Sequence, residues 1–291
     1  TDFFALGALC VSYDGRWMAY SVDSTGDENY ELFIKDLLSG KTRSTGIKGL
    51  SDCIWKADSE TLLLTRVNER FQTDSVWSFD TRSGMKKLIF RESDPAWDLS
   101  LYLNCTRELV FLSSSSKNST EARYMSIAGS TDTWTLLLAR SEGHIYSPDY
   151  YAGKFYIQSN FEDPDYAVYT AEMQDTETSA WKTLVPPRAG NPISTFQLNK
   201  QAILILARQN GFERLEIWDR QGAGLISVLK QEEIMNLDFW DNPDPEADHF
   251  FYTRDSELQP YSIYRYQFID HSESLEYQAK TPEGIKLEEY Q

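Results

Sequence analysis

The sequence has little cysteine and little histidine, and it has no long hydrophobic run. Its cysteines, Cys10, Cys53 and Cys105, lie in or beside apolar segments without a Cys-x-x-Cys spacing. This usage argues against a disulfide framework and predicts a reducing, cytoplasmic setting. No segment approaches the roughly 20 apolar residues of a membrane-spanning helix. The chain also starts without Met or a signal peptide, so we expect a processed or excised piece.

Basic residues are scarce too, with 28 Lys and Arg against 45 Asp and Glu, for a formal net charge of −17. Such a surface repels phosphate backbones and anionic lipid headgroups, so we expect neither nucleic acid nor a membrane as partner. A cationic partner or substrate stays open. So does the simpler interpretation, an acidic surface that only keeps the protein soluble.

Aromatic residues, by contrast, are abundant: 17 Tyr, 15 Phe and 8 Trp. These side chains suit the pleated surface of strands, and no helix-length amphipathic segment interrupts the strand-like runs. In residues 11–40 the runs are separated by tight-turn signals at Asp14-Gly15 and Ser39-Gly40. The predicted fold class is therefore all-β.

The same order of four strands recurs six times along the chain. Four short antiparallel strands every 40 to 50 residues are typical of β-propeller blades. We therefore expect a single propeller domain over residues 1–291. Its predicted blades span residues 6–45, 49–90, 97–139, 144–185, 193–229 and 234–278.

The connections between second and third strands all fall on one face of such a domain. They are predicted to be long and polar, whereas the opposite face carries tight turns. Because loops carry function more often than the scaffold does, this face is the predicted working face. The expected connections are residues 23–29, 67–74, 113–121, 160–165, 209–212 and 255–260.

Motifs for catalysis are missing. No Gly-x-Ser-x-Gly elbow, Gly-x-Gly-x-x-Gly loop or Walker loop occurs, so neither a serine nucleophile nor a cofactor is predicted. Adjacent acids at 27–28 and 232–233 could in principle serve a glycosidase, although such pairs arise freely in an acidic chain. The histidines have no second ligand at metal-binding spacing, and we expect structural or surface roles for them. They are His144, His249 and His271.

Arg66, Arg208 and Arg254 each end the second strand of their own unit. If the register holds, all three lie at the rim of the working face. They either pair with nearby acids or use the guanidinium fork to grip a second domain or a carboxylate ligand.

Several stretches resemble the propeller domain of the prolyl oligopeptidase family, most closely its oligopeptidase B (protease II) members. They are "VSYDGRWMAYSVDSTGDENYELFIKDLLSG" (11–40), "YIQSNFEDPDYAVYTAEM" (156–173), "WKTLVPPR" (181–188) and "NGFERLEIWDR" (210–220). The resemblance implies a seven-bladed propeller over an α/β-hydrolase domain with a Ser-Asp-His triad. It implies a filter that admits short peptides, with cleavage after Lys or Arg.

None of the family's triad or specificity positions is matched, and six blades are counted, so the resemblance implies a fragment without its own activity. By analogy, Asp27, Glu28, Arg66, Glu69 and Arg70 lie near the interface with the hydrolase domain. There they would form gating salt bridges or attract cationic peptides. An incomplete ring would expose strand edges and favour self-association. The alternatives are an autonomous peptide- or protein-binding scaffold and an enzyme with its site in the propeller channel.

Overall fold

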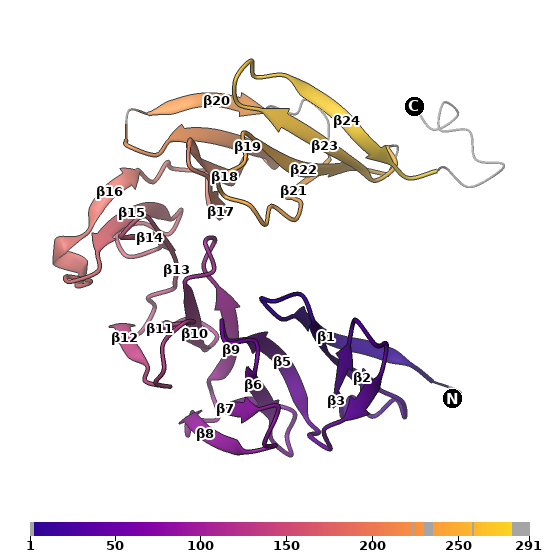
Figure 1. Cartoon of the computed structure of the whole chain (residues 1–291). Helices are drawn as coiled ribbons and strands as arrows, with labels where there is room; N and C mark the ends of the chain where they lie inside the picture. The colour runs from indigo at the N-terminus through magenta and orange to yellow at the C-terminus, as the bar shows by residue number, and fades with distance from the viewer. Residues whose placement is uncertain (1–2, 223, 230–234, 258, 281–291) are drawn as a thin grey trace. The chain divides into compact units, whose positions relative to one another are not determined.

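The computed structural model describes residues 3–222, 224–229, 235–257 and 259–280. These residues form six four-stranded antiparallel sheets and one short 3-10 helix, Thr178–Ala180 (Figure 1). The predicted all-β class and its four-stranded repeat are confirmed. Two compact units, residues 1–144 and 145–291, each contain three of the sheets. Within the described ranges, no helix is long and apolar enough to cross a membrane.

We number the sheets blade 1 to blade 6 in chain order, and unit 1 contains the first three. Blade 1 consists of β1 (Ala5–Val11), β2 (Trp17–Asp23), β3 (Glu31–Asp36) and β4 (Thr42–Ser44). Blade 2 consists of β5 (Leu50–Trp55), β6 (Thr61–Val67), β7 (Thr73–Asp80) and β8 (Lys86–Arg91). Blade 3 consists of β9 (Asp98–Leu103), β10 (Leu109–Ser115), β11 (Thr120–Ser126) and β12 (Thr135–Leu138).

Unit 2 contains the other three blades. Blade 4 consists of β13 (Tyr146–Tyr151), β14 (Lys154–Ser159), β15 (Ala167–Glu172) and β16 (Lys182–Val185). Blade 5 consists of β17 (Ile193–Leu198), β18 (Ala202–Gln209), β19 (Phe212–Asp219) and β20 (Leu225–Leu229). Blade 6 consists of β21 (Asn236–Phe239), β22 (His249–Asp255), β23 (Ser262–Gln267) and β24 (Glu273–Gln278). Residue 234, the predicted start of blade 6, lies outside the described residues.

Local sequence explains why these strands form. In β2, buried residues alternate with partly exposed ones, because successive side chains of a strand point to opposite faces. In β18, six consecutive apolar residues are buried, as expected of a strand that is covered on both faces. The predicted turn at Asp14-Gly15 is confirmed: Gly15 has a φ of 70° and donates to the Ser12 carbonyl at 2.9 Å.

The expectation of long second-to-third connections is wrong for blade 5. Only Asn210 and Gly211 join β18 to β19, and their φ values of 54° and 85° suit a tight hairpin. In blade 3 the connection is shorter than predicted, because Ser113–Ser115 continue β10 and Thr120 begins β11. The opposite end of the sheets is not restricted to tight turns either. It holds the connections at residues 127–134, 173–181 and 240–248.

In unit 1, blade 1 packs on blade 2 through a largely aliphatic core. Trp55, at 2 % exposure, donates from Nε1 to the Cys10 carbonyl of the neighbouring blade at 3.2 Å. Backbone hydrogen bonds from Leu32 to the Ile47 carbonyl and from Leu50 to the Tyr30 carbonyl continue the contact. The buried cluster consists of Ala19, Leu32, Ile34, Ile47, Leu50, Cys53, Trp55, Leu62, Leu64 and Phe79.

A buried carboxylate, that of Glu121 in β11, organises blade 3. Its Oε1 lies 2.5 Å from Arg123 Nη1 and 3.1 Å from Arg140 Nη2. Arg140 also reaches Glu92, which follows blade 2, at 2.6 Å, and its guanidinium lies 3.8 Å from the centroid of the Trp97 ring. Burial acts to raise the pKa of Glu121, but the hydrogen bonds and charges of the two arginines outweigh it and lower that pKa. The network joins blade 3 to the connection that enters it.

Unit 2 contains a related network around Glu216 of β19, whose side chain is fully buried. Glu216 Oε1 lies 2.6 Å from Arg188 Nη1 and 2.8 Å from Arg214 Nε, and Oε2 accepts from Trp218 Nε1 at 2.8 Å. Because Arg188 belongs to the segment between blades 4 and 5, this carboxylate also ties a blade to the connection that enters it.

Candidate functional site

The candidate site is the loop face of unit 1, the end of the sheets where second and third strands are joined. Residues 24–30, 68–72 and 116–119 form these connections. Neighbouring strands are antiparallel, so the segments between blades emerge at this end as well. They are residues 45–49 and 92–97, together with residues 139–144 after blade 3.

The loop that carries Asp27 and Glu28 is built around the buried Asp23. The Asp23 carboxylate accepts hydrogen bonds from the backbone amides of Thr25, Gly26 and Glu28 at 2.8–2.9 Å. Burial acts to raise the pKa of Asp23, but these bonds lower it overall. Glu28 has a φ of 60°, a left-handed conformation that the bond to Asp23 stabilises. The loop therefore presents the exposed carboxylates of Asp27 and Glu28 from a fixed backbone.

Residues Lys48 and Gly49 connect this loop to Arg66. The side-chain oxygen of Asn29 accepts from the Gly49 amide at 2.9 Å, and Arg66 Nε donates to the Lys48 carbonyl at 3.0 Å. Gly49 has a φ of 67°, and a Cβ there would lie 3.4 Å from a Val67 methyl group. Glycine is therefore favoured at this junction, which places Asp27, Glu28 and Arg66 on one continuous surface.

The loop that carries Glu69 and Arg70 is organised by Asn68. Its Oδ1 accepts from the Arg70 amide at 2.8 Å and from the Gln72 amide at 3.3 Å. Gln72 Nε2 in turn donates to the Trp97 carbonyl at 2.9 Å, which fixes the loop against the connection to blade 3. The charged ends of Glu69 and Arg70 are left exposed.

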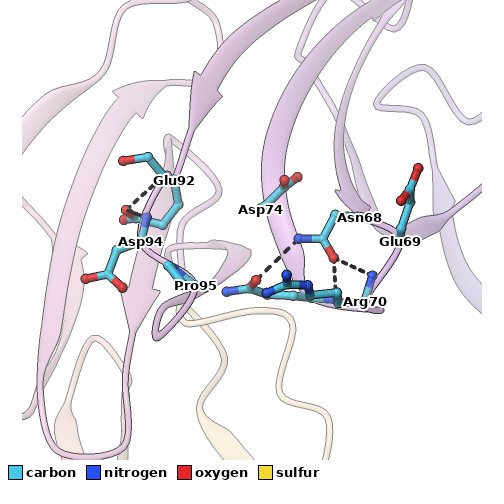
Figure 2. Close-up of a pocket in the computed structure, with 9 residues that line it drawn as sticks. Asn68, Glu69, Arg70, Asp74, Glu92, Asp94 and Pro95 are labelled. Atoms are coloured by element: carbon cyan, nitrogen blue, oxygen red, sulfur yellow. Dashed lines mark hydrogen bonds between the residues drawn. The ribbon is translucent and has the colours of Figure 1, made fainter.

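A pocket of about 450 Å³ lies between this loop and the connection at residues 92–95 (Figure 2). Two of its four carboxylates are neutralised, since Asp74 pairs with Arg91 at 3.0 Å and Glu92 pairs with Arg140. Glu69 and Asp94 add negative charge without a charged partner among the described residues. The pocket is lined by Asn68, Glu69, Arg70, Gln72, Asp74, Glu92, Ser93, Asp94 and Pro95.

The three predicted rim arginines occupy equivalent positions, one residue before the end of β6, β18 and β22. In unit 2, Arg208 pairs with Glu213 at 2.9 Å and Arg254 pairs with Glu273 at 2.8 Å. Both charges are therefore paired within their own blade. Arg66 has no ion-pair partner among the described residues and lies beside the Trp77 ring, 5.8 Å from its centroid.

The structure thus brings five of the predicted residues to one face of unit 1. They are Asp27, Glu28, Arg66, Glu69 and Arg70, and none pairs with a charged residue in the described part of the chain. Arg208 and Arg254 belong to unit 2. Four of these charges are exposed on fixed loops, and Arg66 is half-buried in β6. Unpaired charges of both signs can bind a complementary charged surface or a charged peptide. Their role as gating contacts stays a prediction.

Sequence reasoning missed Asp94 and the aromatic–arginine pair of Trp97 and Arg140, which lies beside the pocket. A signal was present, since strand alternation already places the blade-to-blade connections on this face.

Two other kinds of chemistry, a metal site and the acid pair of a glycosidase, gain no support from the described residues. Searching the described residues finds no group of three or more His, Cys, Asp or Glu that could hold a metal ion. The acid pair at 232–233 lies outside the described residues.

Comparison with known proteins yields one family. The model of the prolyl oligopeptidase N-terminal β-propeller domain matches residues 1–278. An uncharacterized peptidase of Sinorhizobium fredii, y4sO, is 28% identical over 240 residues, which cover 79% of this chain and 34% of that protein. Dipeptidyl aminopeptidase BI of Pseudoxanthomonas mexicana is 22% identical over 271 residues, 90% of this chain and 37% of that protein.

Oligopeptidase B from Leishmania major has a similar solved structure, with a TM-score of 0.90 at 16% identity. The match covers 98% of this chain and 42% of that one. At this identity the likeness concerns the fold, and together with the family match it confirms the β-propeller class. The chain spans about a third of the length of the curated relatives it matches.

Proposed function

The chain belongs to the prolyl oligopeptidase family as its N-terminal β-propeller domain, and from this premise we propose that it gates substrates for a serine peptidase of oligopeptidase B type. In this proposal the chain is not catalytic. The Ser-Asp-His triad lies in an α/β-hydrolase domain of the full-length protein, which cleaves short peptides after Lys or Arg in the cytoplasm. The observation that carries the proposal is the family match over residues 1–278.

The unpaired charges of the loop face support an interdomain role for it. Buried or fully paired charges stabilise their own blade, as Arg208 and Arg254 do. Glu28 and Glu69 instead keep their carboxylates exposed, and the half-buried Arg66 uses Nε on the Lys48 carbonyl but has no ion-pair partner among the described residues. A partner domain of complementary charge would pair with them, and breaking those pairs would accompany opening of the peptidase.

The acidic pocket supports the proposed preference for cationic peptides. Glu69 and Asp94 contribute unpaired negative charge at the same face, and the whole chain carries −17. Such a field raises the local concentration of cationic peptides and speeds their encounter, an effect that salt weakens. The substrates proposed are therefore short peptides with Lys or Arg.

The first test compares the 291-residue chain with the full-length protein on peptides that differ only in carrying Arg, Lys or norleucine. We expect no turnover by the chain alone. The full-length protein should cleave the Arg and Lys peptides and spare the same sequence inside a folded protein. Turnover by the chain would place the active site in the propeller, and release of amino-terminal dipeptides would favour a dipeptidyl peptidase instead.

The second test reverses charge at the loop face of the full-length protein, with Glu28→Lys and Arg66→Glu. We expect each to change kcat/KM for a cationic peptide by about fivefold or more, as for a typical coupling between sites. The control at the opposite end of blade 2 is Arg82→Glu, because Arg82 lies in the turn between β7 and β8, is 75% exposed and pairs only with Glu60, itself 40% exposed, among the described residues. Equal effects at positions 66 and 82 would remove the gating role.

An autonomous scaffold that binds a protein or peptide is the second candidate, since the same unpaired charges fit any charged partner. A Gly-x-Ser-x-Gly segment in the adjoining gene sequence would favour the peptidase. Self-association of the chain through strand edges is a separate proposal. It predicts a concentration-dependent mass in sedimentation, and a monomer at every concentration would contradict it.

A further inference from the structure

Two cysteines that are far apart in the sequence meet where blade 1 packs on blade 2. Cys10 lies in β1 and Cys53 in β5, and their Sγ atoms are 3.1 Å apart. Both strands are sheet edges. The backbone register pairs Cys10 with Ala19 and Cys53 with Leu64, and Ala19 and Leu64 both belong to the core between the two blades.

We infer that Cys10 and Cys53 are a redox modification site: a low-molecular-weight disulfide, such as oxidised glutathione, converts them to a reversible disulfide that links blade 1 to blade 2. The inference is independent of the proposed peptidase function, because it rests only on the contact between two blades. The sequence offered no signal for it, since the spacing of the two residues matches no redox motif.

The geometry needs little change. A disulfide has an S–S distance of about 2.05 Å, so the two sulfur atoms must approach by about 1 Å. The contact around them is already held in place. Trp55 donates to the Cys10 carbonyl, and Asp14 of the next turn donates from its amide to Ser59 Oγ of blade 2 at 3.0 Å. Because β1 is an edge strand, it can shift without breaking a ladder on its outer side.

The two sulfur atoms differ in access, which sets the order of events. Cys53 is 3% exposed, whereas Cys10 is half-buried. The hydrogen bond with Cys10, burial, and the charges of Cys10 and Asp52 all raise the pKa of Cys53, so its thiol keeps its proton at neutral pH. Cys10 is therefore the sulfur that meets the oxidant first.

The reaction proceeds by two thiol–disulfide exchanges. The Cys10 thiolate attacks one sulfur of the small disulfide, the S–S bond breaks, and the first small thiolate leaves and takes up a proton. The Cys53 thiol then loses its proton to water, its sulfur attacks Cys10 Sγ, and the second small thiolate leaves and is protonated. In total, two protein thiols are oxidised to one disulfide while one small disulfide is reduced to two thiols.

The test incubates the folded chain with oxidised glutathione and counts reactive thiols after denaturation. We expect one thiol of three to remain, an intact mass lower by two hydrogen atoms, and a peptide map that joins Cys10 to Cys53. The linked form should have a higher Tm, and dithiothreitol should restore all three thiols and the original Tm. Three remaining thiols, or a link through Cys105, would overturn the inference.

Cysteine variants show whether the disulfide forms because the fold brings Cys10 and Cys53 together or because all the thiols react. Cys53→Ser should stop at a glutathione adduct on Cys10, because no second sulfur is present to displace it. The matched control is Cys105→Ser, which removes the cysteine of the turn between β9 and β10 and should still form the link. Wild-type chain oxidised in urea should lose the preference for Cys10–Cys53. The same preference in urea would contradict a role for the folded contact, whether or not the variants fold.

Discussion

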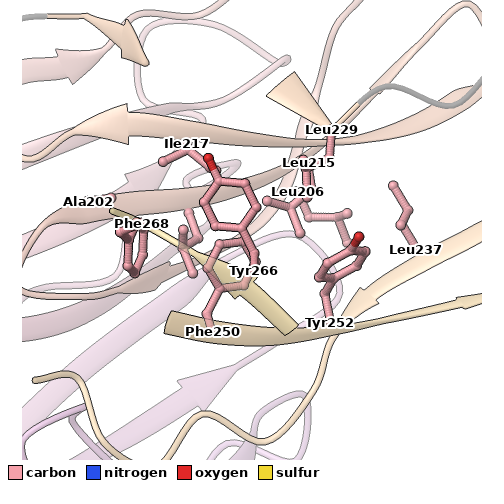
Figure 3. Close-up of a cluster of buried hydrophobic side chains, with 11 residues drawn as sticks. Ala202, Leu206, Leu215, Ile217, Leu229, Leu237, Phe250, Tyr252, Tyr266 and Phe268 are labelled. Carbon is pink, nitrogen blue, oxygen red and sulfur yellow. The ribbon is translucent and has the colours of Figure 1, made fainter. Parts of the chain in front are cut away.

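The two units fasten neighbouring blades with different side chains. Between blades 1 and 2 the buried contact has six Leu and Ile residues, the thiol of Cys53 and two aromatic rings, of Trp55 and Phe79. Between blades 5 and 6 it contains four aromatic rings, of Phe250, Tyr252, Tyr266 and Phe268 (Figure 3). Phe250 lies at the centre of this group, 5.1 Å from the Tyr266 ring and 5.6 Å from the Phe268 ring.

This difference teaches that one backbone repeat accepts a variable number of buried aromatic rings beside the same number of Leu and Ile residues. Aliphatic side chains fill the space between sheets without directional demands. Aromatic rings bury more area each but prefer particular mutual orientations, and a tyrosine hydroxyl needs a partner. Tyr252 finds its partner in Glu273, which also binds Arg254. The rim arginine of blade 6 thus shares an acid with a core tyrosine, whereas Arg66 of blade 2 contacts the Trp77 ring without an acid partner among the described residues.

The largest expected effect comes from removing the central ring of the aromatic group between blades 5 and 6. Phe250→Ala should reduce the free energy of unfolding by about 3–5 kcal/mol, because it leaves a cavity among rings that cannot close it. Hydrogen exchange should rise more in β17–β24 than in β1–β12. The conservative control Phe250→Leu should cost much less. Equal increases in hydrogen exchange in both units would show that this cluster stabilises the whole chain rather than blades 5 and 6.

Removing a buried carboxylate, that of Glu216 in unit 2 or Glu121 in unit 1, should reduce the free energy of unfolding by less than Phe250→Ala does. Glu216→Ala should cost about 3 kcal/mol, the low end for a broken buried pair, because it leaves Arg188 and Arg214 without their anion. Glu121→Ala should cost about 2 kcal/mol, since the Glu121 side chain is 7% exposed where that of Glu216 is fully buried, and Arg140 still binds Glu92. The denaturant midpoint should fall further for Glu216→Ala than for Glu121→Ala. A larger fall for Glu121→Ala would show that the burial of the carboxylate does not determine the size of the loss.

The lowered pKa of Glu121 predicts a pH dependence that Glu121→Gln lacks. The folded pKa lies below the unfolded one, so the carboxylate's contribution to stability is full above the unfolded pKa, about 4.3. It is lost as the pH falls through the folded pKa. The gap in unfolding free energy between wild type and Glu121→Gln should therefore be constant near pH 6–7 and narrow below about pH 4. If the difference in unfolding free energy widened as the pH fell, the pKa of Glu121 would have to be raised in the folded state rather than lowered.

The smallest effect concerns the rim arginines. Arg208→Ala breaks an exposed pair with Glu213 and should cost about 0.2–1 kcal/mol. Arg66→Ala breaks no ion pair among the described residues and loses one bond to the Lys48 carbonyl, so its cost should be similar or lower. Thermal melts of the two variants side by side measure this. A larger loss at position 66 would show that Arg66 supports the fold rather than a partner.

Sequence patterns predicted what short-range physics controls. Alternating or continuous apolar runs located the strands, and Asp14-Gly15 located a turn, because each depends on neighbours in the chain. Contacts between distant segments were out of reach. The pocket needs residues 68–72 beside residues 92–95, and the Cys10–Cys53 contact joins two blades. Pairing was also out of reach: Arg66, Arg208 and Arg254 look alike in sequence, yet only the fold shows which ones have acids beside them.

The even number of strands in each blade has a consequence for how such a protein changes over evolution. A chain that crosses a sheet four times leaves at the end of the sheet where it entered, so within each unit the linkers lie at the loop-face end of the sheets. Insertions at either end of a sheet therefore leave the direction of the next blade unchanged, as the connections at residues 173–181 and 240–248 illustrate. A blade with an odd number of strands would leave the chain at the other end of the sheet, and every later blade would run in the opposite direction. The number of strands in a blade is therefore a stricter constraint than the length of its loops.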